Sequence, residues 1–141
     1  MDLEQQLAST PLLAGLDRGS LRRLATHATR RTYAPGDVIV REGSTGTALY
    51  VILRGRVRVE RRGEADEAVL GELGPGDFFG ELALIEEHPR TASVIAVEET
   101  ECILFAAWEF RGMLETHPQI ALPIMRALIA RMHRREHHPS G

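Results

Sequence analysis

Short β-strand patterns separated by turn residues follow one another through the middle of the sequence. The clearest covers residues 54–62, where Val57 and Val59 alternate with arginines, as expected for a half-buried strand. Further strand patterns occupy residues 38–41, 49–53, 68–73, 92–97 and 101–105. In Gly74-Pro75-Gly76-Asp77, proline presets φ and glycine tolerates positive φ, which predicts a turn. Many short strands at close spacing predict an antiparallel barrel or roll.

Helical patterns flank this β region and complete a mainly β fold. Asp17 is a plausible N-cap for the second of two N-terminal helices. Near the C-terminus, Pro118 fits the first turn of a long last helix, and Pro123 is expected to kink that helix or delay its start. The expected single domain, residues 1–136, comprises N-terminal helices (1–28), a β-roll (29–106) and two C-terminal helices (107–136), followed by a flexible tail (137–141).

Composition excludes several classes of protein. A chain of 141 residues is most simply one domain, and its single cysteine, Cys102, permits no internal disulfide. The N-terminus lacks the basic start and apolar stretch of a signal peptide, and no apolar run approaches the ~18 residues of a membrane span. We therefore expect a cytoplasmic protein without a membrane segment. A net charge of −3 argues against a nucleic-acid-binding footprint over the whole chain.

The segment from Phe79 to Ser93 combines groups that suit a phosphorylated sugar. Gly80 opens a predicted short helix at 80–85, where backbone N–H groups at the helix start favour negative charge. Glu81 can accept hydrogen bonds from a ribose hydroxyl. Arg90, nine positions further on, can fork onto two phosphate oxygens. Taken singly, Arg90 is equally compatible with a surface arginine before a strand, and Glu81 with an acidic residue favoured in a first helical turn.

These residues resemble the phosphate-binding cassette of the cyclic nucleotide-binding domain family, without a gap from Phe79 to Val94. Looser matches to strand and turn positions of that family are Gly43, Tyr50-Val51-Ile52, Gly55, Val57, Val59 and Gly74-Pro75-Gly76-Asp77. The resemblance implies an antiparallel, jelly-roll-like β-roll that binds cAMP or cGMP as a ligand. It implies no cofactor, no metal and no catalytic residue.

The resemblance also implies roles for individual residues. Arg90 and the helix start at Gly80 would bind the cyclic phosphate, and Glu81 the ribose. Further backbone N–H groups would come from Leu82, Ala83, Thr91 and Ala92. The hydroxyl of Thr91 would reach both the phosphate and the exocyclic amine of guanine, so cGMP binding is implied as an option without excluding cAMP. The alternative for Thr91 is a solvent-facing residue that opens a strand.

The base would lie on an apolar wall formed by Val59, Leu70 and Gly71, although these residues equally fit the core of a barrel. Leu128 and Met132 in the last helix are candidate lid residues over the ligand. The apolar positions of that helix cover more than one ordinary face. One stripe comprises Ile120, Ile124, Ala127 and Leu128, and the adjacent one comprises Ala121, Met125, Ile129 and Met132. One stripe can pack on the roll, whereas the other needs a ligand, a partner chain or another helix and is compatible with a homodimer. The alternative is an ordinary helix that is well buried within its own domain.

Other polar clusters carry weaker signals. His133, His137 and His138 lack the ligand pattern that would complete a metal site, so a solvated tail is favoured. A run of arginines between residues 54 and 62 has no interleaved aromatic residues to stack bases, and nearby glutamates are expected to pair with it.

The favoured function is therefore the sensing of a cyclic nucleotide, with a rearrangement of the C-terminal helices as the signal. After Ala106 only 141 − 106 = 35 residues remain, and two helices use them, so DNA binding by this chain is not expected. A protein partner or a fused effector would carry the signal onward. Three alternatives stay open: a nucleotide-independent interaction or dimerisation module, an effector domain cut from a larger regulator, and a small enzyme acting on phosphoesters.

Overall fold

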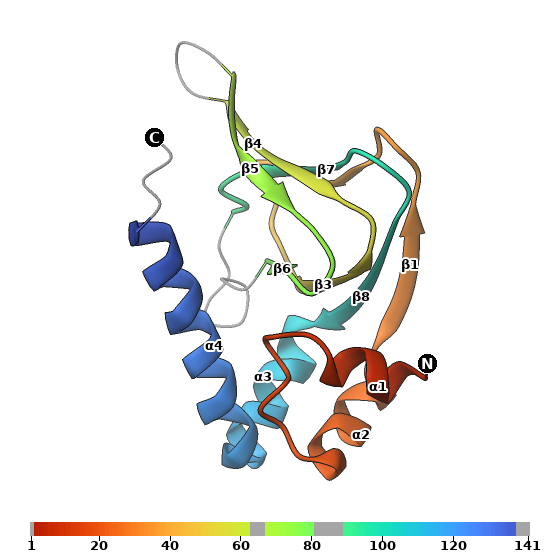
Figure 1. Cartoon of the computed structure of the whole chain (residues 1–141), viewed down its shortest axis with the longest axis vertical. Helices are drawn as coiled ribbons and strands as arrows, with labels where there is room; N and C mark the ends of the chain where they lie inside the picture. Colours follow the sequence, from red (N-terminus) through yellow and green to blue (C-terminus); the bar gives the residue numbers. More distant parts are fainter. Residues whose placement is uncertain (1, 63–66, 81–88, 138–141) are drawn as a thin grey trace.

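The computed structural model describes residues 2–62, 67–80 and 89–137, and its strands form two antiparallel sheets (Figure 1). The strands are β1 (Thr29–Tyr33), β2 (Val38–Val40), β3 (Ala48–Arg54), β4 (Val57–Arg62), β5 (Glu67–Leu73), β6 (Phe78–Phe79), β7 (Ser93–Ala96) and β8 (Thr100–Ala106). Within this described part, one sheet has the order β1-β8-β3-β6 and the other the order β2-β7-β4-β5. The predicted antiparallel β-roll is confirmed.

Helices flank the roll on both sides in sequence. They are α1 (Leu3–Ala8), α2 (Arg18–Thr26), α3 (Ala107–Thr116) and α4 (Pro118–His137). Asp17 caps α2 as predicted, because its Oδ1 accepts a hydrogen bond from the Ser20 backbone N–H at 2.7 Å. The same hydrogen bond lowers the pKa of the Asp17 carboxyl. In Figure 1, α1, α2 and α3 lie at one end of the roll and α4 runs along its side.

Pro123 does not delay the start of α4, since the helix begins at Pro118 and continues through Pro123, and the kink stays a prediction. Proline removes one backbone donor from the helix interior. Packing of the neighbouring residues offsets that loss, because Ile120 and Ile124 are 0% and 2% exposed. The N-terminal segment also packs closely here, since a Cβ on Gly15 would lie 2.9 Å from the Cβ of Pro123. None of the helices in the described residues is long and apolar enough to cross a membrane.

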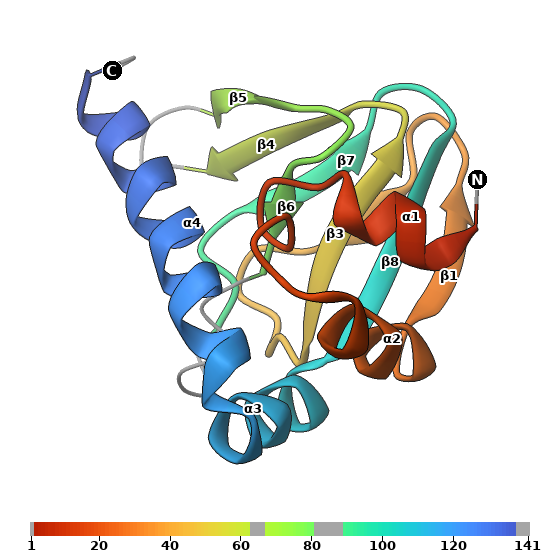
Figure 2. The same cartoon turned by 60° about the horizontal axis from the view of Figure 1, so that its bottom comes forward.

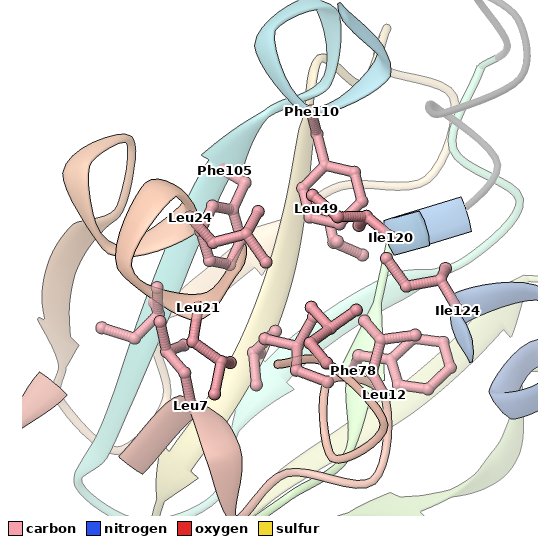
Figure 3. Close-up of a cluster of buried hydrophobic side chains, with 14 of the residues drawn as sticks. Leu7, Leu12, Leu21, Leu24, Leu49, Phe78, Phe105, Phe110, Ile120 and Ile124 are labelled. Atoms are coloured by element: carbon pink, nitrogen blue, oxygen red, sulfur yellow. The ribbon is translucent and has the colours of Figure 1, made fainter. Parts of the chain in front are cut away.

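The main hydrophobic core joins the helices to the sheet that contains β3 and β8 (Figures 2 and 3). Its largest buried side chains include Leu7, Leu12, Leu13, Leu24, Leu49, Ile103, Phe105, Phe110, Ile120 and Ile124. The rings of Phe105 and Phe110 meet edge to face at 5.5 Å, which ties the end of β8 to α3. The C-terminal helices are thus packed on the roll through a shared core.

A second apolar cluster fills the interior of the roll between the two sheets. Its buried members are Ile52, Val57, Phe79, Val94 and Cys102. Burial raises the pKa of the Cys102 thiol to about 12, so this cysteine stays protonated near neutral pH. Strand β6 connects the two clusters, because Phe78 belongs to the main core and Phe79 to the interior of the roll. Successive side chains of a strand point to opposite faces, which explains this division.

Three arginines in and between β3 and β4 pair with glutamates, and for Arg56 and Arg58 the partners are nearby in sequence, as predicted. Arg56 lies 3.1 Å from Glu72 on the neighbouring strand, and Arg58 pairs with Glu60 along its own strand. Arg54 pairs with glutamates that precede and open β8. Exposed pairs of this kind are worth up to about 1 kcal/mol each, so their main effect here is to neutralise a basic strip.

Candidate functional site

The backbone of Arg90 is fixed to the loop between β2 and β3. Its N–H donates to the carbonyl oxygen of Ser44 at 2.7 Å, and its own carbonyl accepts from the N–H of Gly43 at 2.8 Å. Thr45 and Pro89 form an isolated antiparallel bridge beside these bonds. Both the backbone N–H and the backbone carbonyl of Arg90 are therefore bonded to a segment that is far away in sequence. These bonds fix the backbone position from which the arginine side chain extends.

The side chain of Arg90 turns inward along the same loop. Its Nη2 donates to the carbonyl oxygen of Ala48 at 2.9 Å, and its Cζ lies 5.9 Å from the centroid of the Tyr50 ring. Arg90 is half-buried. The side chain is thus partly buried with a backbone partner, so the alternative of a surface arginine does not describe Arg90.

Two glycines make room for the guanidinium. A Cβ on the buried Gly46 would lie 2.0 Å from Nε of Arg90, which no side chain can accommodate without displacing the arginine. Gly80 has a φ of +86°, and a Cβ there would lie 2.6 Å from the Ala48 carbonyl oxygen and 2.7 Å from Nη1 of Arg90. Glycine is needed at Gly80 both for its backbone conformation and for the close approach of the guanidinium.

An aromatic pair supports this arrangement from inside the roll. Tyr50 of β3 stacks on Phe79 of β6, with ring centroids 4.7 Å apart and planes inclined by 7°. The two residues are also directly paired in the sheet. Burial raises the pKa of the Tyr50 hydroxyl, although the positive charge of Arg90 acts in the opposite direction. Tyr50 therefore remains neutral and serves as a rigid neighbour of the guanidinium.

A cavity of about 230 Å³ opens beside Arg90. Its lining residues are Val38, Ile39, Val40, Arg41, Ser44, Thr45, Gly46, Thr47, Ala48, Tyr50 and Arg90. Two arginines and four hydroxyl side chains are present among these described residues, none of which carries a carboxylate, so the electrostatic character of the described lining favours an anion. The volume is below the roughly 300–1,000 Å³ of typical ligand pockets, so this space suits part of a nucleotide rather than the whole molecule.

Of the remaining residues predicted to bind phosphate or ribose, the structure describes only Thr91 and Ala92. Glu81, Leu82 and Ala83, with the predicted helix at 80–85, lie outside the described residues, and their roles stay predictions. Thr91 is exposed and its carbonyl oxygen accepts a hydrogen bond from Nε of Arg61 at 3.1 Å, while Ala92 is half-buried.

The predicted base wall lies on the β4–β5 pair. Val59 is paired with Gly71 and packs against the interior cluster. Leu70 is the extra residue of a β-bulge, because Val59 pairs with Gly71 and the next residue, Glu60, pairs with Val69; Leu70 is 40% exposed. None of Val59, Leu70 and Gly71 lines the cavity beside Arg90. These three residues therefore stay predictions for the base.

The two candidate lid residues differ in exposure. Leu128 packs against the main core, whereas Met132 is 58% exposed, and neither lines the cavity. A neighbour that the sequence pattern did not single out makes the contact with the roll: Nη1 of Arg131 donates to the carbonyl oxygen of Phe78. Gly46 was also missed. Both depend on contacts between distant segments, for which spacing along the chain gives no signal.

Comparison with known proteins agrees with this geometry. Residues 30–117 match the family model described as the cyclic nucleotide-binding domain. The chain belongs to this family. Over 126 residues it is 34% identical to the cyclic AMP receptor protein of Thermus thermophilus, covering 89% of this chain and 58% of that protein. Over 112 residues it is 36% identical to a cGMP-dependent protein kinase of Drosophila melanogaster, covering 77% of this chain and 15% of the kinase.

A solved structure confirms the architecture of this cyclic nucleotide-binding domain. The N-terminal domain of a transcriptional regulator from Streptomyces coelicolor superposes with a TM-score of 0.78 at 30% identity, covering 93% of this chain and 92% of the other. The chain spans less than two thirds of the two curated relatives, so it corresponds to a domain within each of them.

Proposed function

We propose that this chain is a non-catalytic regulatory domain that binds cAMP or cGMP and signals through its C-terminal helices. The observation that carries the proposal is the seating of Arg90. Its backbone is bonded on both sides to the 43–44 segment, and its guanidinium lies between Gly46 and Gly80 with a hydrogen bond to Ala48. An arginine held in one geometry loses little entropy when it binds an anion, which favours a phosphate ligand.

The cyclic phosphate would contact Arg90 and the backbone near Gly80, as family membership suggests. Backbone N–H groups of Leu82, Ala83, Thr91 and Ala92 would complete the phosphate site, and Glu81 would bind the ribose. The two arginines of the described cavity lining, Arg41 and Arg90, support an anionic ligand.

The base would pack on the Val59, Leu70 and Gly71 surface. A β-bulge beside Val59 supports this assignment, because bulges re-aim side chains and are frequent next to binding sites. The hydroxyl of Thr91 would favour guanine without excluding adenine. One relative is named for cyclic AMP and another for cGMP, so both nucleotides belong in the test.

Signalling would require that the nucleotide contact one arrangement of α3 and α4 better than another. The most exposed apolar residues of α4 indicate where a protein partner would bind. Leu122, Met125, Ile129 and Met132 are 48–58% exposed and follow a 3-4-3 spacing, the a/d pattern of a two-helix seam. We propose a second copy of the chain as this partner, although a fused effector or another protein would use the same face.

A cytoplasmic location remains a prediction from the single cysteine. The expectation that this domain does not itself contact DNA is a separate prediction.

Isothermal titration calorimetry with cAMP, cGMP and the non-cyclic 5′-AMP tests the proposal. We expect heat and a raised melting temperature with at least one cyclic nucleotide, because a ligand at a hundredfold excess over Kd stabilises the fold by about 2.7 kcal/mol. No heat and no thermal shift would instead support an interaction module without nucleotide. Chromatography of the nucleotide after incubation should recover it unchanged, whereas a new product would show an enzyme.

Sedimentation of the same samples tests the homodimer. We expect a dimer for the wild-type chain and a monomer for Met125→Glu, because a charge in the apolar seam opposes pairing. A wild-type monomer at high concentration contradicts the homodimer and leaves the nucleotide site unaffected.

A further inference from the structure

Arg131 links the second half of α4 to the roll at one short strand. Its Nη1 donates to the carbonyl oxygen of Phe78, and its Cζ lies 4.4 Å from the centroid of the Phe78 ring. A guanidinium over an aromatic face gains electrostatic attraction, and more so when partly desolvated. Arg131 is half-buried and Phe78 is 4% exposed, so both contacts lie away from bulk water.

The strand that Arg131 contacts, β6, is followed directly by Gly80, which lies beside the guanidinium of Arg90. Phe78 faces the main core together with Ile124 of α4 (Figure 3), and Phe79 faces the interior of the roll. Phe79 stacks on Tyr50, whose ring lies below the guanidinium of Arg90. Gly80 follows and approaches the same guanidinium. An uninterrupted series of contacts therefore runs from α4 through β6 to the predicted anion site.

Strand β6 is only two residues long and is paired with β3 alone, through Val51 and Tyr50. Its backbone pairing is therefore short, and the hydrogen bond from α4 to the Phe78 carbonyl adds to the packing of the two phenylalanine rings. Among described residues, this is the only side-chain hydrogen bond between α4 and the roll. The first half of α4 is fixed separately, by burial of Ile120 and Ile124.

We infer that Arg131 is a positioning residue that couples α4 to nucleotide binding. By holding Phe78–Gly80 in place, it keeps Gly80 and Tyr50 in the arrangement that receives Arg90 and a cyclic phosphate. Coupling of this kind is reciprocal, so bound nucleotide also holds the second half of α4 on the roll. This inference rests on the proposed function, and it adds the residue through which the site and the signalling helix communicate.

Two substitutions of Arg131 and one control test the coupling. Arg131→Met keeps the apolar stem and removes the donors and the charge, whereas Arg131→Lys keeps a positive charge over the Phe78 ring and loses the fork. Arg126→Met is the matched control, because Arg126 lies on the same helix, is exposed, and makes no hydrogen bond or ion pair among the described residues. Calorimetry with cAMP and cGMP measures affinity. Hydrogen exchange of residues 126–133, with and without nucleotide, measures docking of α4.

We expect Arg131→Met to bind about tenfold more weakly, because charged hydrogen bonds contribute more than neutral ones. In Arg131→Met, the second half of α4 should exchange faster than in the wild type when nucleotide is absent, and it should gain little protection when nucleotide binds. Arg131→Lys should be intermediate, and Arg126→Met should match the wild type in both readouts. Melting curves confirm that each variant is folded, and if Arg131→Met does not fold, the comparison of Arg131→Lys with Arg126→Met decides.

The results that would contradict the coupling differ from those that would contradict the proposed function. Wild-type affinity in both Arg131 variants overturns the coupling even if exchange of α4 rises, because the contact would then be structural only. Tighter binding also overturns it, since the contact would restrain the site instead of positioning it. A wild-type chain that binds no nucleotide overturns the proposed function and the coupling together, whereas failure of the coupling alone leaves wild-type binding intact.

Discussion

Replacement of Gly80 by alanine tests whether the structure correctly places the turn that follows β6. Gly80 has a φ of +86°, a conformation that costs a residue with a side chain about 1–3 kcal/mol. The added Cβ would also lie 2.6 Å from the backbone carbonyl oxygen of Ala48 and 2.7 Å from Nη1 of Arg90. Because a backbone oxygen cannot rotate away, β3 and β6 must shift, which adds about 1–3 kcal/mol.

The total expected loss is roughly 2–6 kcal/mol in the free energy of unfolding, or a fall in melting temperature of roughly 6–18 °C for a chain of this size. Calorimetric unfolding measures it, and titration with cyclic nucleotide should show weakened binding because Arg90 is displaced. Gly74→Ala is the control, since no atom lies within 4 Å of a Cβ at Gly74 and its φ lies outside the left-handed region. We expect it to change stability by less than about 1 kcal/mol. Equal melting temperatures and affinities for Gly80→Ala and Gly74→Ala would refute the reasoning.

Two further predictions concern stability. Ile124→Ala should lower the free energy of unfolding by about 2–5 kcal/mol in urea unfolding, because Ile124 is 2% exposed and a cavity would remain between α4 and the core; a loss below about 1 kcal/mol would contradict the packing of α4. Asp17→Ala should lower the melting temperature at neutral pH by removing the cap of α2. Because the pKa of Asp17 is lowered from 3.8 in the folded state, its charge contributes stability above pH 3.8. The difference in melting temperature between the wild type and Asp17→Ala should therefore become smaller as the pH falls below that value. A difference independent of pH would exclude a charged cap.

Local signals in the sequence predicted much of the fold. Alternation in Val57 and Val59 identified β4, and the polar residue before an apolar period identified the cap at Asp17. Pro123 shows the limit of such signals. Its effect on a helix depends on how firmly the neighbouring turns are buried, and Ile120 and Ile124 supply that burial only in the folded chain.

The sequence predicted the residue that would bind an anion, but it did not predict the residues that hold it in position. Arg90 was identified because its spacing from Gly80 matches a known pattern, and its inward orientation follows from that interpretation. Gly46 and Arg131 lie 44 and 41 residues away in sequence from Arg90 and could not be connected to it by periodicity or spacing. Their contacts depend on the path of the β2–β3 loop and on the docking of α4, which only the three-dimensional structure supplies.

The affinity of Arg90→Ala for cAMP and cGMP tests the central claim most directly. Arg61→Ala serves as the control, since Arg61 is an exposed arginine that bonds the carbonyl of the adjacent Thr91. Removing the partner of a desolvated charge costs about 2–5 kcal/mol, so we expect Arg90→Ala to bind at least roughly thirtyfold more weakly than the wild type while remaining folded. Arg61→Ala should retain most of the affinity. A folded Arg90→Ala chain that binds either nucleotide as tightly as the wild type would contradict the account.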